Sequence, residues 1–189
     1  MESAVREAVD WGGPLGVLVA SAGVGAVQSL EHTQPDDWRW IWETNVSGTL
    51  FTAQAAMRAM HRSSGGSVVL IGSDAGVVQE RSIGAYSVTK AAVISMTKVL
   101  ALDGAGDGIR VNCVCPGFFQ PGMRHFPDRG ACIEGSDGAG YTDPPKPPAG
   151  RYADVGEVAR AVLFFALPSS TFCTGSVLLV DGGTTAGIP

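Results

Sequence analysis

A tyrosine and a lysine four residues apart are the first pair in this sequence that could do chemistry. Tyr86 and Lys90 lie in an apolar segment, and this spacing puts both side chains on one face of a helix. A free phenol ionises near pH ~10, but an ammonium within reach can lower its pKa by about 1–3 units. The pair could therefore exchange a proton with a substrate, although a simple packing pair is the commoner outcome at this spacing.

Two further polar residues occupy positions that a site with Tyr86 and Lys90 would use. Ser73 lies 13 residues before Tyr86, just beyond the apolar run Val68–Ile71, and open α/β sheets place their sites at the carboxyl ends of strands. Asn45 falls on the apolar stripe of a long helical segment, where a buried amide needs hydrogen-bond partners. We therefore predict a specific hydrogen-bonding role for Asn45; the alternative is that it caps or kinks the helix.

Short apolar runs alternate with helical segments and would position these residues. The runs are Leu15–Ala20, Val68–Ile71, Ile109–Cys115 and Val177–Val180. Their continuous apolarity is typical of parallel strands that are covered on both faces. Helices are predicted over residues 2–11, about 35–60, 82–102 and 155–167, and the last of them is expected to begin after Asp154, with Glu157 three residues further on. This alternation indicates an α/β fold.

The segment Phe118–Arg151 interrupts this alternation. It is rich in Gly, Pro and Asp, and a connection of this length in a compact domain is usually a functional loop or a disordered one. We interpret residues 118–151 as a mobile lid within a single domain that covers residues 1–189.

Composition limits the classes of partner. The chain has 189 residues, 45% of them hydrophobic, and a formal net charge of −5. Lys and Arg form no cluster, so neither a nucleic-acid partner nor an anionic membrane is expected. No apolar run approaches the roughly 20 residues that a membrane span needs, and acidic rather than basic residues begin the chain. We expect a cytoplasmic protein.

Cysteines and histidines give no sign of a metal site. The three histidines are far apart in the sequence, and the closest cysteines, Cys113 and Cys115, form a C-x-C pair. We expect the two thiols to point to opposite faces of a strand, which argues against a disulfide, a redox pair or a zinc site.

Taken together, these motifs resemble the short-chain dehydrogenase/reductase family over nearly the whole chain. The matching residues are Val19–Gly23, Asn45–Gly48, Ser73, Tyr86–Lys90, Ile109–Gly117 and Thr174–Gly183. The resemblance implies a Rossmann-like three-layer α/β/α fold with a mostly parallel sheet. It also implies NAD(P)-dependent interconversion of a small secondary alcohol and a carbonyl compound, by a homo-oligomer that is a dimer or a tetramer.

The resemblance implies a role for each matching residue. Tyr86 would be the general acid/base, and Ser73 would hold the substrate oxygen. Lys90 would bind the nicotinamide ribose and lower the pKa of Tyr86, and Asn45 would hold a water that links Lys90 to solvent. NAD or NADP would supply the hydride chemistry. Its expected contacts are Ala20, Gly23, Tyr86, Lys90, Pro116, Gly117 and Phe119.

The sequence departs from the family at its beginning. No Gly-rich phosphate-binding loop precedes Leu15–Ala20, although the family binds the pyrophosphate on such a loop and the helix after it. The four apolar runs would therefore be family strands 4, 5, 6 and 7, in an N-terminally truncated chain that lacks the first three strands. We expect Leu15–Ala20 to form an edge strand, and cofactor binding by this chain to be weak.

Two functions follow from these observations. The intact set Asn45, Ser73, Tyr86 and Lys90 favours an oxidoreductase, although one that could be inactive in this form because the phosphate loop is lacking. The alternative is a non-catalytic remnant of the family that acts as an oligomerisation or binding module.

Overall fold

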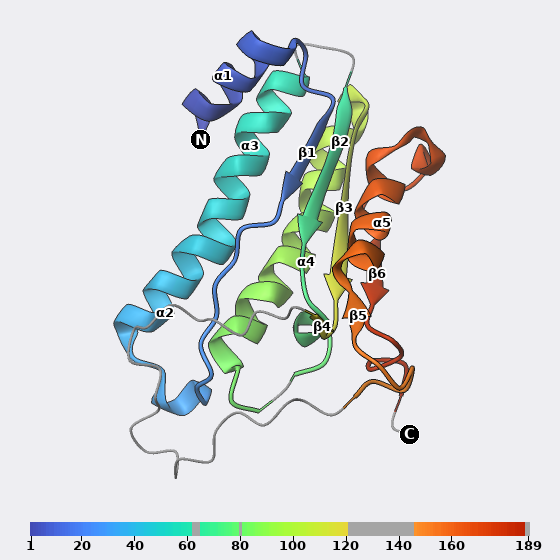
Figure 1. Ribbon diagram of the computed structural model, residues 1–189. Helices are drawn as coiled ribbons and strands as arrows, with labels where there is room; N and C mark the ends of the chain where they lie inside the picture. The colour runs from blue at the N-terminus through green and yellow to red at the C-terminus, as the bar shows by residue number, and fades with distance from the viewer. Residues whose placement is uncertain (62–64, 80, 121–145, 188–189) are drawn as a thin grey trace.

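A parallel sheet of four strands organises the molecule. The computed structural model describes residues 1–61, 65–79, 81–120 and 146–187. The strands are β1 (Val17–Ala20), β2 (Gly66–Ile71), β3 (Ile109–Pro116) and β6 (Val177–Val180). They follow one another in the order β1-β2-β3-β6, with every neighbouring pair parallel. Each predicted apolar run forms one strand, and β1 lies at an edge of the sheet, as expected (Figure 1).

Helices cover the sheet in two layers. They are α1 (Glu2–Gly12), α2 (Pro35–Trp42), α3 (Thr49–Met60), α4 (Gly84–Gly104) and α5 (Val155–Ala166). The α3 and α4 helices lie on one face of the sheet and α5 on the other (Figure 1). The predicted start of α5 is confirmed, because Asp154 and Glu157 form a reciprocal capping box there. The expected α/β fold with helices on both faces is therefore confirmed.

The alternation of side chains along the strands divides the core in two. Leu70 and Cys113 pack with Met57 and Val93 against α3 and α4, because alternate residues of a strand share one face. The intervening residues of the same strands point to α5, where Phe165 is 2% exposed. Both faces of β2 and β3 are thus buried.

The two close cysteines share one face of β3, so our expectation that their thiols point to opposite faces is wrong. Residues i and i+2 of a strand lie on the same side, and the Sγ atoms of Cys113 and Cys115 are 3.6 Å apart. Both thiols are fully buried next to Gly72. A side chain at Gly72 has no room, since a Cβ there would lie 2.6 Å from the Cys115 Sγ.

A π-helical turn interrupts the helix that we predicted over residues 35–60. The turn spans Glu43–Gly48 and joins α2 to α3 without a break. Such turns insert an extra residue into a helix and occur frequently at functional sites. The turn contains Asn45, which is fully buried.

The segment from Phe118 to Arg151 is only partly described. Its first described residues include β4 (Phe119–Gln120), which pairs in parallel with β5 (Ala153–Asp154). Residues 121–145 lie outside the described residues, so the lid stays a prediction.

One described helical stretch, Gly84–Asp107, is long and apolar enough to cross a membrane by length and composition alone. This is weak evidence for a span, because the stretch packs on the sheet as a core helix: Val93, Leu100 and Ala101 belong to the buried cluster that contains β2 and β3.

Candidate active site

Ser73 begins a tight turn at the carboxyl end of β2. It caps a single 3₁₀ turn, Asp74–Gly76, and its Oγ accepts a hydrogen bond from the backbone N–H of Ala75 at 3.2 Å. The Ser73 hydroxyl in turn donates to Oδ1 of Asp74 at 3.0 Å. Oδ1 also accepts the Ala75 N–H at 2.8 Å. The serine hydroxyl is therefore held in a fixed orientation by its own turn.

The α4 helix brings Tyr86 and Lys90 to this turn. The Lys90 Nζ lies 5.5 Å from the centre of the Tyr86 ring and donates to the carbonyl oxygen of Ile71 at 2.9 Å. The Ser73 side chain is near enough to the Tyr86 hydroxyl to lower its pKa. Three of the four predicted catalytic residues thus meet at the end of β2.

Asn45 is linked to the site by hydrogen bonds to Thr89 and to the backbone of Val24, in the loop that follows β1. Its side-chain oxygen accepts the N–H of Val24, and its amide nitrogen donates to the carbonyl oxygen of Val24, both at 2.8 Å. The same nitrogen donates to the Thr89 Oγ1 at 3.0 Å, and that hydroxyl donates to the Tyr86 carbonyl oxygen at 2.7 Å. The amide is fully paired, as a buried amide must be.

Burial sets the protonation of the two central groups. Burial raises the pKa of Tyr86 to about 12, with the charge of Asp74 adding to the increase and the nearby Ser73 side chain opposing it. Burial also lowers the pKa of the Lys90 ammonium, and the neighbouring Cys113 and Cys115 oppose that decrease. The groups that shift the pKa of Tyr86 in this structure do not include Lys90, so the expectation that Lys90 lowers this pKa stays a prediction.

The predicted cofactor contacts fall into two groups. Gly23 borders the catalytic residues, since a Cβ there would lie 3.2 Å from the Lys90 Nζ and 3.4 Å from the Asn45 Oδ1. Pro116 ends β3, and the next residue, Gly117, borders Asp74 in the same way, at 3.0 Å from Oδ2. Ala20 ends β1 and Phe119 lies in β4; the hydrogen bonds described above do not include them.

Two residues of this site were missed by our sequence reasoning. Thr89 lies between Tyr86 and Lys90 in the sequence and is 1% exposed; its position among these residues was an available signal. Asp74 follows Ser73 directly, at the end of a buried strand where polar residues cluster at active sites. Its pKa is raised by burial, and by the charge of Asp181 nearby.

The donors that remain at this site suit a ligand rich in hydroxyl groups. An ammonium has three hydrogens, and among the described residues the Lys90 Nζ donates one hydrogen bond, to Ile71. Because Gly23 carries no side chain, the backbone approaches this ammonium without covering it. A ribose diol could accept the remaining hydrogens. Within the described part of the chain, no group of three or more His, Cys, Asp or Glu residues could hold a metal ion.

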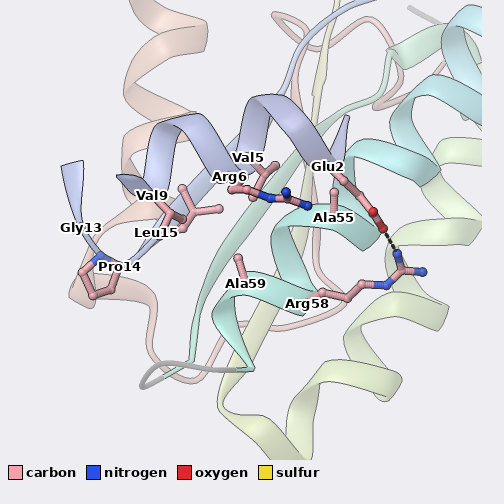
Figure 2. A pocket seen from close by; sticks show the side chains of 10 residues that line it. All are labelled: Glu2, Val5, Arg6, Val9, Gly13, Pro14, Leu15, Ala55, Arg58 and Ala59. Carbon is pink, nitrogen blue, oxygen red and sulfur yellow. Dashed lines mark hydrogen bonds and ion pairs between the residues drawn. The ribbon is translucent and has the colours of Figure 1, made fainter. Parts of the chain in front are cut away.

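A groove lies away from these residues, between α1 and α3. It encloses about 370 Å³ and is lined by apolar side chains such as Val5, Val9 and Leu15. Figure 2 shows the ion pair between Glu2 and Arg58 at one end of it. None of the predicted site residues lines this groove.

Comparisons with known proteins match nearly the whole chain. The family model described as enoyl-(acyl carrier protein) reductase matches residues 1–185. The inactive 2-(S)-hydroxypropyl-CoM dehydrogenase 2 of Xanthobacter autotrophicus is 37% identical over 181 residues, which are 92% of this chain and 75% of that protein. Galactitol 2-dehydrogenase (L-tagatose-forming) of Cereibacter sphaeroides is 34% identical over 175 residues, 91% of this chain and 66% of that protein.

A solved structure agrees with these matches. The gluconate 5-dehydrogenase of Burkholderia cenocepacia, in complex with NADP and tartrate, superposes with a TM-score of 0.84 and 31% sequence identity. The superposition covers 99% of this chain and 71% of that one. The chain therefore spans between 66% and 75% of the length of these three proteins.

Proposed function

Because the chain belongs to the short-chain dehydrogenase/reductase family, we propose that it interconverts a small secondary alcohol and a carbonyl compound with NAD or NADP, using Tyr86 as general acid/base. The observation that carries this proposal is the convergence of Ser73, Tyr86 and Lys90 at the carboxyl end of β2. Asn45 reaches the same place through Thr89. Proton exchange needs donors and acceptors held at one point, and these residues provide them.

Each side chain has a distinct task in this reaction. The Tyr86 hydroxyl gives a proton to a carbonyl oxygen or takes one from an alcohol, while Ser73 holds that oxygen beside it. Lys90 holds the ribose with its free N–H groups and is itself oriented by its bond to Ile71. Asn45 fixes the Val24 backbone opposite Lys90. When bound, the nicotinamide supplies the hydride chemistry.

The names of the similar proteins support both the cofactor and the substrate class. Galactitol, the substrate in one name, is a polyol, and another similar protein is a gluconate dehydrogenase bound to NADP. We infer that NAD or NADP and a small hydroxylated substrate suit this chain as well. Gly23 and Gly117 are the positions where the cofactor would approach the backbone, because neither has a side chain to cover Lys90 or Asp74.

A spectrophotometric assay tests the proposed reaction. The purified chain is mixed with NAD or NADP and a panel of polyols and hydroxy acids, and with the reduced cofactors and the corresponding ketones, while absorbance at the nicotinamide band is followed. We expect hydride transfer with at least one pair. Absence of transfer with every member of the panel, from a protein whose circular dichroism shows it folded, would contradict the proposal.

The homo-oligomeric state is part of this proposal. Phe51 on α3 and Val99 and Leu102 on α4 expose apolar side chains, with Leu102 81% exposed. Exposed apolar residues on neighbouring helices are typical of subunit interfaces. Sedimentation velocity should show a dimer or a tetramer; a stable monomer over a wide concentration range would contradict this part.

A further inference from the structure

Thr89 links two parts of the candidate site that are far apart in the sequence. Its Oγ1 accepts a hydrogen bond from the Asn45 Nδ2 at 3.0 Å and donates one to the Tyr86 carbonyl oxygen at 2.7 Å. The first of these bonds joins the π-helical turn that contains Asn45 to the α4 helix. Thr89 is 1% exposed, so water does not compete for either bond.

The direction of each bond follows from the groups that make it. A carbonyl oxygen only accepts, so the one hydrogen of the Thr89 hydroxyl is directed to Tyr86 and a lone pair of Oγ1 faces Asn45. Of the two ends of the Asn45 amide, only the nitrogen can donate to a lone pair. Thr89 therefore selects one of the two orientations of the Asn45 amide.

The selected orientation is the one that fits the backbone of Val24. The Asn45 Oδ1 accepts the Val24 N–H, and the Nδ2 donates to the Val24 carbonyl oxygen, both at 2.8 Å. A reversed amide would place an oxygen against that carbonyl and hydrogens against that N–H, so both bonds would be lost. One directed set of bonds thus joins the loop after β1, the π-helical turn and α4.

This set of bonds holds the loop after β1 beside Lys90. Gly23 precedes Val24, and a Cβ at Gly23 would lie 3.2 Å from the Lys90 Nζ and 3.4 Å from the Asn45 Oδ1. The ammonium itself is held by the carbonyl oxygen of Ile71 at 2.9 Å. The space around this ammonium, where the proposed function places the nicotinamide ribose, therefore depends on the distance between the loop and α4.

We propose, on the basis of the function proposed above, that Thr89 is a positioning residue whose hydroxyl holds the Gly23–Val24 loop at the distance from Lys90 that binding of NAD or NADP requires. It acts through Asn45 and not on the reacting atoms. Loss of the hydroxyl should therefore weaken cofactor binding and leave the chemical step with its residues in place. Small displacements of positioning groups have large effects on a site of this kind.

Three variants of α4 isolate the contribution of the Thr89 hydroxyl. Thr89→Val replaces the hydroxyl by a methyl group of similar size, and Thr89→Ser keeps the hydroxyl. Thr97→Val is the matched control, because Thr97 is also fully buried on α4 and its Oγ1 donates to the carbonyl oxygen of Val93 at 2.9 Å. This control removes a buried hydroxyl and a bond within the helix, and it leaves the link to Asn45 intact.

Hydrogen exchange followed by NMR tests the link without cofactor or turnover. Exchange is measured at the Val24 N–H and at the Asn45 side-chain amide, relative to the backbone N–H groups of β3 in the same protein, which corrects for global unfolding. In Thr89→Val we expect exchange at both groups to be about tenfold faster, because the amide loses the acceptor that orients it. Thr89→Ser and Thr97→Val should exchange like the wild type.

Steady-state kinetics tests the consequence for the cofactor. With the best substrate of the panel, Thr89→Val should raise the KM for the cofactor about tenfold and change kcat by less than about twofold, because the lost contact positions the cofactor and not the reacting atoms. Thr89→Ser should restore the wild-type KM. Thr97→Val should lower the free energy of unfolding as Thr89→Val does, without raising the KM.

The outcomes separate this proposal from the proposed function. A wild-type KM or wild-type exchange in Thr89→Val would overturn the proposal even if the chain is an active dehydrogenase. An equal increase in KM in Thr97→Val would also overturn it, because any lost buried hydroxyl would then have the same effect. If no hydride transfer is found with any substrate, the proposed function fails and the role in cofactor binding fails with it, while faster exchange in Thr89→Val would still show that Thr89 holds the loop.

Discussion

The β1 strand is wholly apolar and β3 contains Arg110 and Asn112, yet β3 is the more deeply buried of the two. Every residue of β3 except Arg110 is buried, and the catalytic candidates gather around its carboxyl end and that of β2. In β1 one residue of four is buried, and Val17 and Val19 are 41% and 42% exposed. The α1 helix beside this edge contains no buried residue. Buried residues are concentrated in β2 and β3, at the centre of the sheet. Side chains there are held more firmly in position than those at the β1 edge.

The difference in burial between β1 and β3 shows which part of the sheet supports the candidate site. The turn at Ser73 and the bond from Lys90 to Ile71 both arise from the end of β2, whose inner residues are covered on both faces. A rigid support of this kind holds catalytic groups in position. We therefore expect substitutions in the centre to have large effects, and equivalent ones at the β1 edge to have small effects.

The largest stability effect is expected for Asn45→Ala. The variant leaves both backbone groups of Val24 and the Thr89 hydroxyl without their partner, in a place where Asn45 is fully buried. Losing several buried hydrogen bonds should lower the free energy of unfolding by about 3 kcal/mol. Urea denaturation measures it, and Gln54→Ala on α3, a half-buried position, should change it by less than about 0.5 kcal/mol. If Asn45→Ala lowered the free energy of unfolding as little as Gln54→Ala does, the argument that buried hydrogen bonds stabilise the site region would be wrong.

The pair Val69 and Val19 isolates burial from sequence. The two residues are direct partners in the register of β1 and β2, and Val69 is fully buried while Val19 is not. Val69→Ala should lower the free energy of unfolding by about 2 kcal/mol through the cavity it creates, and Val19→Ala by about 0.5 kcal/mol. Equal losses in chemical denaturation would mean that the α5-side face of β1 is covered in solution.

The third prediction concerns the cost of burying Lys90. Its ammonium is buried and its pKa is lowered, so Lys90→Met should raise the free energy of unfolding near pH 7 by about 1 kcal/mol. Lys98→Met, at an exposed position of the same helix, should change it by less than about 0.5 kcal/mol.

The increase in the free energy of unfolding that we expect for Lys90→Met should depend on pH in one direction. A lowered pKa in the folded state means that the unfolded chain binds more protons, so the wild type gains stability as pH rises from the folded pKa toward the ordinary lysine value of 10.5. The advantage of Lys90→Met should therefore shrink as the pH rises toward 10.5. An advantage that grows with pH would contradict the burial argument.

The smallest effect is expected at the groove between α1 and α3. The ion pair of Glu2 and Arg58 is largely exposed on both sides, and exposed pairs contribute about 0–1 kcal/mol. Glu2→Gln should therefore leave the denaturation midpoint almost unchanged. Hydrogen exchange should be much faster in α1 than in α4, because no residue of α1 is buried. Protection of α1 equal to that of α4 would show that the edge is as ordered as the centre.

Much of the fold could be predicted from the sequence because apolar runs and caps are local signals. The four runs became the four strands of the sheet, and the start of α5 followed from Asp154 and Glu157. The edge position of β1 was expected from the resemblance, but the exposure of its faces could not be predicted, because an apolar run does not show whether helices cover it. The π-helical turn at Asn45 also has no local sequence signal that we recognised.

The site was predictable as a set of residues but not as an electrostatic environment. The types and spacing of Ser73, Tyr86 and Lys90 correctly predicted that these residues lie close together. The increased pKa of Tyr86 depends on burial, which is a property of the packed structure. Asp74 was missed because its contact with Ser73 depends on the tight turn that follows β2.

Turnover of Tyr86→Phe tests the central claim most directly. With the best substrate of the panel, rates and cofactor affinity are measured for the wild type, for Tyr86→Phe and for the matched control Tyr152→Phe, whose ring packs against Phe118. We predict that Tyr86→Phe lowers the rate by about 10²–10⁴-fold with nearly unchanged cofactor affinity, whereas Tyr152→Phe retains most of the rate. Equal rates for Tyr86→Phe and the wild type would show that the residues gathered at the end of β2 are not the catalytic site.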